Sequence, residues 1–110
     1  GDVVGKTCIV ADDMIDTAGS ITEGAKALVN KGAKDIYVAA THGIFSPPAF
    51  ERIDSSPIKE VVVTNTLEVP EERRHGKIHV LSVAPLFAHA ISNVYNDESV
   101  SELFDPDFQL

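Results

Sequence analysis

The stretch Thr7–Ser20, TCIVADDMIDTAGS, decides the fold. It begins with a short apolar run, residues 8–11, which is typical of a buried strand that is covered on both faces. Two carboxylates, residues 12–13, come where that strand should end, and a loop of small residues follows them. Ser20 and Glu23 have the spacing of a capping box, so we expect a helix with Ser20 as its N-cap. The stretch therefore predicts the first half of a βαβ unit.

The loop between the acid pair and this helix has the composition of an anion site. It is formed by residues that are small or carry a short polar group: Asp16, Thr17, Ala18, Gly19 and Ser20. Free N–H groups at a helix start attract anions, and the helix dipole adds to the attraction. No lysine or arginine occurs between residues 7 and 22, so backbone N–H groups and hydroxyls would hold a phosphate here. Because Asp12 and Asp13 can accept hydrogen bonds from ligand hydroxyls, the pattern indicates a sugar phosphate.

Taken alone, these features fit an ordinary structural turn as well as they fit a phosphate site, since short motifs recur in many α/β proteins.

A phospho-accepting receiver domain also has two acids after its first strand. That class needs an aspartate at the end of the central strand and a lysine at a later strand end. The corresponding positions here are Thr41, Thr64 and Asn65, so the sequence argues against a receiver domain.

The whole chain has the composition of one globular domain. It has 110 residues, of which 44% are hydrophobic and 24% charged. The net charge of −8 argues against a nucleic-acid surface, and no apolar run approaches the ~20 residues of a membrane span. The single cysteine, Cys8, excludes an intrachain disulfide and favours a cytoplasmic location. Because the chain begins with Gly1 and its only methionine is Met14, we expect a piece of a longer protein.

Hydrophobic periodicity predicts an α/β fold with a mainly parallel sheet of about four strands, flanked by helices and joined by right-handed crossovers. The expected strands are residues 7–12, 35–40, 60–64 and 77–83, and the last should be a sheet edge. The expected helices are residues 21–31, a short helix capped by Ser46, and residues 84–95. The last helix should turn five apolar residues inward: Leu86, Phe87, Ala90, Ile91 and Val94. The tail from residue 96 should pack on its own domain or on a neighbouring subunit.

Ligands of parallel α/β sheets bind at the carboxyl ends of the strands. Here the later strands end in Thr41-His42-Gly43 and Thr64-Asn65-Thr66. With no cysteine or acid nearby to orient it, His42 is better interpreted as a packing or hydrogen-bonding residue than as a catalytic one. The other histidines lack metal-ligand spacing, so we predict no metal site in this chain.

The loop string resembles the phosphoribosyl-pyrophosphate loop that phosphoribosyltransferases and ribose-phosphate pyrophosphokinases share: an apolar strand, two acids, two variable residues and Asp-Thr-Ala-Gly-Ser/Thr. Three further strings, residues 40–46, 62–66 and 98–104, resemble the C-terminal part of ribose-phosphate pyrophosphokinases in order and spacing. The resemblance covers essentially the whole chain. It implies that residues 1–110 are a single domain, a fragment of the C-terminal domain, of type I phosphoribosyltransferase fold, in a longer two-domain chain.

This resemblance implies an activity for the parent enzyme. The family transfers diphosphate from ATP to ribose 5-phosphate with Mg²⁺, giving phosphoribosyl pyrophosphate and AMP, and it forms homo-hexamers. By resemblance, the residues that bind ribose 5-phosphate are Asp12, Asp13, Asp16, Thr17, Ala18, Gly19 and Ser20. Those that match a regulatory phosphate and nucleotide site are Ser99, Val100, Ser101 and Phe104. The family's ATP-binding, metal-binding and catalytic segments lie upstream of this chain, so the resemblance implies no catalytic residue in this piece.

Two other hypotheses stay open. A phosphoribosyltransferase would use the same loop to hold phosphoribosyl pyrophosphate while a base attacks it. A non-catalytic paralogue would keep the fold in order to regulate the enzyme. The sequence does not identify the effector, the organism, the nucleotide preference or the exact oligomer.

Overall fold

The structure is a computed structural model that describes residues 1–109. Its strands form one parallel sheet in the order β1-β2-β3-β4: β1 (Thr7–Ile15), β2 (Asp35–Gly43), β3 (Ile58–Thr64) and β4 (Ile78–Leu81). The helices are α1 (Gly19–Asn30), α2 (Ala49–Asp54) and α3 (Ala84–Tyr95), with two 3₁₀ turns, η1 (Glu71–Arg73) and η2 (Ser101–Phe104). The predicted α/β class, parallel sheet and edge position of the last strand are confirmed.

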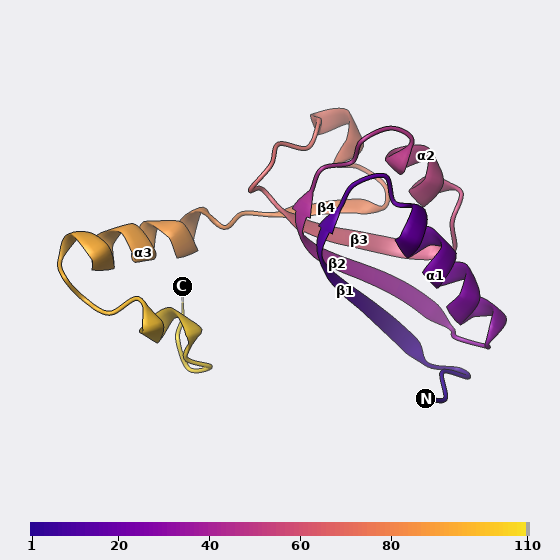
Figure 1. Cartoon of the computed structure of the whole chain (residues 1–110), viewed down its shortest axis with the longest axis horizontal. Coiled ribbons are helices and arrows are strands. Elements are labelled where there is room, and N and C mark those ends of the chain that lie inside the picture. The colour runs from indigo at the N-terminus through magenta and orange to yellow at the C-terminus, as the bar shows by residue number, and fades with distance from the viewer. Residues whose placement is uncertain (110) are drawn as a thin grey trace.

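One face of the sheet carries the core. Alternate residues of β2, namely Ile36, Val38 and Ala40, are buried, and α1 and α2 lie over this same face (Figure 1). Because successive side chains of a strand point to opposite faces, the intervening residues of β2 point to the other side. The helices therefore cover only one of the two faces of the sheet.

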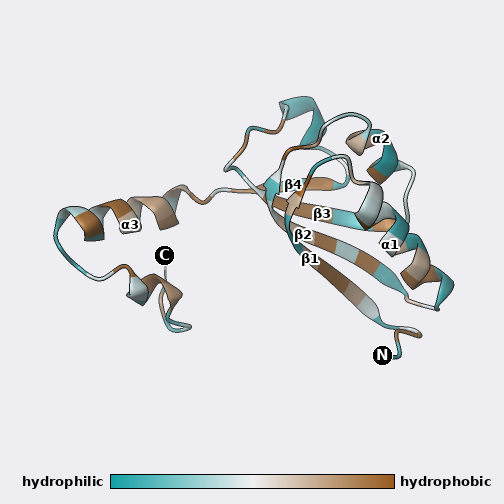
Figure 2. Cartoon of the chain, viewed as in Figure 1, coloured by the Kyte–Doolittle hydropathy of each residue, from teal (hydrophilic) through white to brown (hydrophobic). Residues whose placement is uncertain are grey.

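The other face of the sheet is open. Within residues 1–109 it carries apolar side chains at both edges: Ile9 of β1 is 73% exposed and Leu81 of β4 is 60% exposed. Figure 2 shows apolar residues along β1, the edge strand of the sheet. The prediction that the first strand is covered on both faces was wrong, because β1 is an edge strand and α1 packs on only one of its faces.

The first two strands run further than predicted. β1 continues to Ile15 instead of ending at residue 12, because Met14 pairs with His42 and Ile15 with Gly43 of β2. β2 likewise continues to Gly43 instead of ending at residue 40. β3 starts two residues earlier than expected, and β4 spans only residues 78–81 of the expected 77–83. The acid pair consequently lies within β1 and not after it.

Neither of the first two helices begins as predicted. α1 starts at Gly19 with Ala18 as its N-cap and without a side-chain cap, so the predicted capping box is wrong. The Glu23 carboxylate instead accepts a hydrogen bond from Lys26 at 3.2 Å. α2 starts after Pro48, also without a side-chain cap, so Ser46 does not cap it. In α1 the start of the helix is set by tertiary packing, because the N-cap residue Ala18 is buried.

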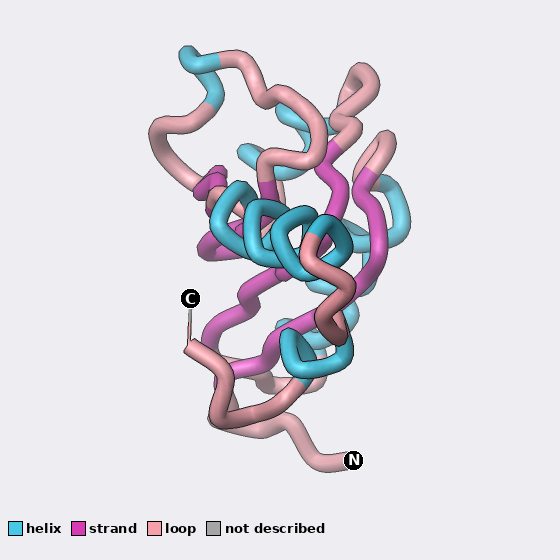
Figure 3. Tube along the Cα trace, turned by 90° about the vertical axis from the view of Figure 1, so that its left-hand side faces the viewer, coloured by secondary structure: helices cyan, strands magenta, loops and turns pink. Residues whose placement is uncertain are grey.

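The third helix has the predicted bounds but not the predicted packing. α3 runs from residue 84 to 95, yet Phe87, Ile91 and Val94 are exposed where they were expected to face inward. The chain leaves β4 through residues 82–83 and carries α3 away from the sheet (Figure 1). Figure 3, viewed from the side of α3, shows this helix and the tail in front of the sheet. With no sheet beneath it, the apolar side of α3 stays exposed.

The tail packs against α3 of the same chain. Asn93 of α3 donates hydrogen bonds from Nδ2 to the Ser99 carbonyl at 2.8 Å and to Glu102 Oε1 at 2.6 Å. The rings of His89 and Phe108 meet edge to face, with centroids 5.3 Å apart. Helix and tail therefore form a unit of their own beside the sheet.

A substitution at Gly43 would test the junction of β2 with the following turn. A Cβ atom there would overlap Cε2 of Phe45, whose ring is buried, with its centroid 4.9 Å from that of Phe50. Gly43→Ala is expected to lower the free energy of unfolding by about 1–3 kcal/mol, the usual cost of overpacking. Urea denaturation followed by circular dichroism measures this, with Gly1→Ala, which meets no atom within 4 Å, as control. An unchanged midpoint would contradict the packing described here.

Candidate functional site

A cavity lies at the carboxyl end of β1, between the strand and the start of α1. Its volume is about 190 Å³, and we call it the loop cavity. It is lined by Asp12, Met14, Ile15, Asp16, Thr17, Ala18, Gly19, Ser20 and Ile21. The structure thus brings together all the residues predicted to bind the sugar phosphate except Asp13.

The backbone of the loop is arranged to present N–H groups. Ala18, the N-cap of α1, has φ 66° and ψ 12°, which is the left-handed region, and is only 5% exposed. The first helical hydrogen bond runs from the Thr22 N–H to the Ala18 carbonyl at 3.1 Å, and the Thr22 hydroxyl donates to the same oxygen at 2.7 Å. Because no side chain caps the helix, the N–H groups of residues 19–21 are left for an external acceptor.

The two acids of β1 are placed differently. Asp12 lines the loop cavity, as do Met14 and Ile15 further along β1. Asp13 does not line the loop cavity, and its N–H donates to Asp12 Oδ1 at 2.8 Å. Both carboxylates are exposed. The acid pair therefore does not line one cavity.

The neighbouring strand ends form a small polar network. His42 Nδ1 and Thr66 Oγ1 are 2.7 Å apart, and the Thr64 hydroxyl donates to the Thr41 carbonyl at 2.6 Å. His42 is therefore engaged in a hydrogen bond, as the sequence indicated. Since it pairs with Met14 in the sheet, this network borders the loop cavity.

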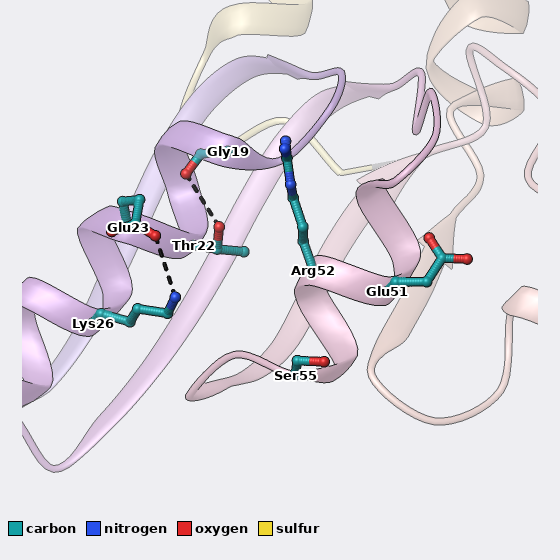
Figure 4. A pocket seen from close by; sticks show the side chains of 7 residues that line it. All are labelled: Gly19, Thr22, Glu23, Lys26, Glu51, Arg52 and Ser55. Carbon is teal, nitrogen blue, oxygen red and sulfur yellow. Dashed lines mark hydrogen bonds and ion pairs between the residues drawn. The ribbon is translucent and has the colours of Figure 1, made fainter.

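One residue at the site was missed by the sequence analysis. Arg52 of α2 donates from Nη1 to the Thr17 carbonyl at 3.1 Å. Figure 4 shows its side chain extended from α2 toward the loop at Gly19. It also lines a separate groove of about 520 Å³ between α1 and α2, together with Gly19, Thr22, Glu23, Lys26, Glu51 and Ser55. No local signal in the sequence points to this contact, because 35 residues separate Arg52 from Thr17.

The residues matched to a regulatory site lie in the tail, on the unit formed with α3. Ser99 and Ser101 are together, with their hydroxyl oxygens 2.6 Å apart and the Ser101 N–H donating to Ser99 Oγ at 3.1 Å. Val100 is exposed and Phe104 is 85% exposed. The buried Asn93 holds the start of this turn through the Ser99 carbonyl.

Within residues 1–109, no three histidine, cysteine, aspartate or glutamate side chains lie together as a ligand set for a metal ion. In the same range, no helix has the length and the apolar character that crossing a bilayer would require.

Comparison with known proteins gives consistent results. The model of the phosphoribosyl synthetase-associated domain family matches residues 1–105. Ribose-phosphate pyrophosphokinases of Clostridium tetani and Bacillus cereus are 57% and 55% identical over 105 residues, which is 96% of this chain and 33% of each relative. The chain thus spans about a third of the length of these curated relatives.

A solved structure agrees with the sequence matches. The crystal structure of phosphoribosylpyrophosphate synthetase from Mycobacterium smegmatis superposes with a TM-score of 0.85 at 49% identity. The match covers 88% of this chain and 33% of that protein. The chain therefore belongs to the phosphoribosyl synthetase-associated domain family.

Proposed function

We propose that the chain is the ribose 5-phosphate-binding part of a longer ribose-phosphate pyrophosphokinase. The parent enzyme would transfer the diphosphoryl group of ATP to the 1-hydroxyl of ribose 5-phosphate and release AMP. The observation that carries the proposal is the loop cavity, where free N–H groups at the start of α1 lie beside Asp12. The names of the relatives support the same activity.

Each part of the loop cavity has a role in this proposal. The backbone N–H groups and hydroxyls of residues 16–20 hold the 5-phosphate, which the positive end of the helix dipole attracts. Asp12 accepts hydrogen bonds from the ribose hydroxyls, and such bonds to an ionised acceptor are stronger than neutral ones. Asp13 does not line the loop cavity, so it has no assigned contact with the sugar. The chain thus binds and orients the sugar.

The transfer step needs groups that the loop cavity lacks. A transferring diphosphoryl group is stabilised by cations and Mg²⁺, whereas no lysine or arginine lines the loop cavity. The described residues do not fit a magnesium site by themselves. We propose that the parent enzyme supplies the magnesium ligands and the ATP-binding residues from outside this chain. The 110-residue chain alone is expected to show no turnover.

The proposal extends to assembly and location. Parallel sheets are almost always covered on both faces, so the open face of this sheet supports a longer domain that covers it. The exposed apolar side of α3, lined by Ala90, Ile91, Val94 and Tyr95, supports contacts between subunits of a homo-hexamer. The turn of Ser99, Val100 and Ser101, with Phe104, would contribute to a regulatory phosphate and nucleotide site there. We place the parent enzyme in the cytoplasm.

Phosphorus NMR of the full-length protein with ribose 5-phosphate, ATP and Mg²⁺ tests the reaction. Appearance of AMP together with phosphoribosyl pyrophosphate is the expected result. Ribose 5-phosphate binding without turnover would instead favour a non-catalytic paralogue. A reaction that requires phosphoribosyl pyrophosphate and a nucleobase would favour a phosphoribosyltransferase, and either result would overturn the proposed activity.

Substitution of the two acids tests the arrangement of the sugar site. Asp12→Asn is expected to weaken ribose 5-phosphate binding by about 10- to 100-fold, the effect of losing a charge-assisted hydrogen bond. Asp13→Asn serves as the matched control and should change affinity less than threefold, since Asp13 does not line the loop cavity. Isothermal titration calorimetry gives both dissociation constants. Equal losses in the two variants would show that the ligand contacts both carboxylates.

A further inference from the structure

Arg52 contacts the loop from outside the loop cavity. Its Nη1 atom donates to the Thr17 carbonyl at 3.1 Å. A Cβ atom built on Gly19 would lie 3.2 Å from the same Nη1 atom. The guanidinium group is therefore close to the backbone at both ends of the turn that contains Ala18.

The side of the loop that Arg52 occupies argues against direct contact with a bound anion. Arg52 lines the groove between α1 and α2, together with Gly19, Thr22 and Ser55 among others. It does not line the loop cavity. Any effect of Arg52 on a ligand in the loop cavity therefore acts through the loop backbone.

The hydrogen bond to Thr17 fixes the direction of one peptide unit. In a trans peptide the carbonyl and the N–H point in opposite directions. Because the Thr17 carbonyl points toward Arg52, the N–H of Ala18 points away from it. The groove lies on the Arg52 side, so this direction favours presentation of the N–H to the loop cavity.

This peptide orientation needs support from outside the loop. Ala18 has φ 66°, and residues with a Cβ rarely adopt the left-handed region unless their surroundings hold them there. The backbone of α2 at Arg52 is held in place by packing, since Ala49 and Ile53 of the same helix are both buried. The bond from α2 can therefore hold the loop in the conformation that exposes its N–H groups.

We propose that Arg52 is a positioning residue of the loop, which holds the Thr17 carbonyl so that the Ala18 N–H faces a bound phosphate. The inference rests on the proposed function, because it takes ribose 5-phosphate as the ligand of the loop cavity. It adds to that function a contribution from α2, a helix that does not touch the ligand site.

The test uses the full-length protein and compares Arg52→Ala, Arg52→Lys and a matched control. The control is Arg73→Ala, since Arg73 also contacts α2, through Glu51 and Asp54, but does not contact the loop. Arg52→Ala is expected to weaken ribose 5-phosphate binding about tenfold, with ATP affinity and the unfolding midpoint unchanged. Arg52→Lys should recover part of the loss, because a lysine keeps a charged donor. Arg73→Ala should bind as the wild-type protein does.

A double-mutant cycle with Gly19→Ala separates positioning from a general structural effect. If the Cβ atom added by this substitution acts by displacing Arg52, Gly19→Ala should weaken binding in the wild-type background and change it little when Arg52 is already replaced by alanine. Additive losses, or an Arg52→Ala protein that binds within twofold of wild type, would overturn the inference and leave the proposed function standing. An equal loss of ATP affinity and of stability would overturn it as well. A wild-type protein that does not bind ribose 5-phosphate would overturn both.

Discussion

Gly19→Val is expected to raise the dissociation constant for ribose 5-phosphate at least 100-fold, which corresponds to about 2.7 kcal/mol of binding free energy. Gly19 lies between the loop cavity and Arg52, and even a Cβ atom there would come within 3.2 Å of Arg52 Nη1. The two further methyl groups of valine cannot be placed without moving the guanidinium group or the first turn of α1. Either movement disturbs the N–H groups on which binding depends.

The same helix offers a control for this substitution. Gly24 lies further along α1, beyond its first turn, and a Cβ atom there would meet nothing within 4 Å. Gly24→Val should therefore leave the affinity within twofold of the wild-type value. Calorimetric titration of both variants with ribose 5-phosphate makes the comparison. If the Gly19 variant kept its affinity, the loop cavity would not be the phosphate site.

Ile36→Ala is expected to lower the free energy of unfolding by about 2–5 kcal/mol, the range for large-to-small changes in a core. Ile36 is fully buried at the start of β2, where it pairs with Cys8 of β1 and Ile58 of β3. The loss is a large share of the ~5–15 kcal/mol that stabilises a typical domain. Urea denaturation of the 110-residue chain measures it.

Ile9→Ala is the matched control, since Ile9 lies on the open face of the same sheet and is 73% exposed. Its effect should stay within about 0.5 kcal/mol, as for most surface substitutions. Similar losses of unfolding free energy in the two variants would mean that the open face of the sheet is covered in solution.

Much of the fold follows from local patterns in the chain. The apolar runs predicted every strand to within a few residues, and the periodicity of residues 84–95 predicted the bounds of α3. Their order predicted a parallel sheet, because strands joined through a helix return in the same direction. Most residues of the loop cavity were found in the same way, since residues 16–20 are contiguous in sequence and form one turn.

What could not be predicted depends on contacts between distant segments. β1 ends where its partner β2 ends, and this pairing places Asp12 and Asp13 inside the strand. The start of α1 depends on the burial of Ala18, which no capping pattern reports. The contact from Arg52 joins α2 to a turn 35 residues earlier. Periodicity identified an apolar side on α3, but it does not state which surface, if any, covers that side.

The separation of α3 from the sheet has a hydrodynamic consequence. The radius of gyration of the Cα atoms is 16.6 Å, and the longest dimension is 52 Å. A compact chain of this length has a radius of about 13 Å. In small-angle X-ray scattering the chain would therefore give a pair-distance distribution with a long shoulder, and in gel filtration it would elute earlier than its mass suggests. If α3 docked against the sheet, the radius of gyration would fall and the chain would elute later. A measurement of particle size would therefore detect the docking of this helix.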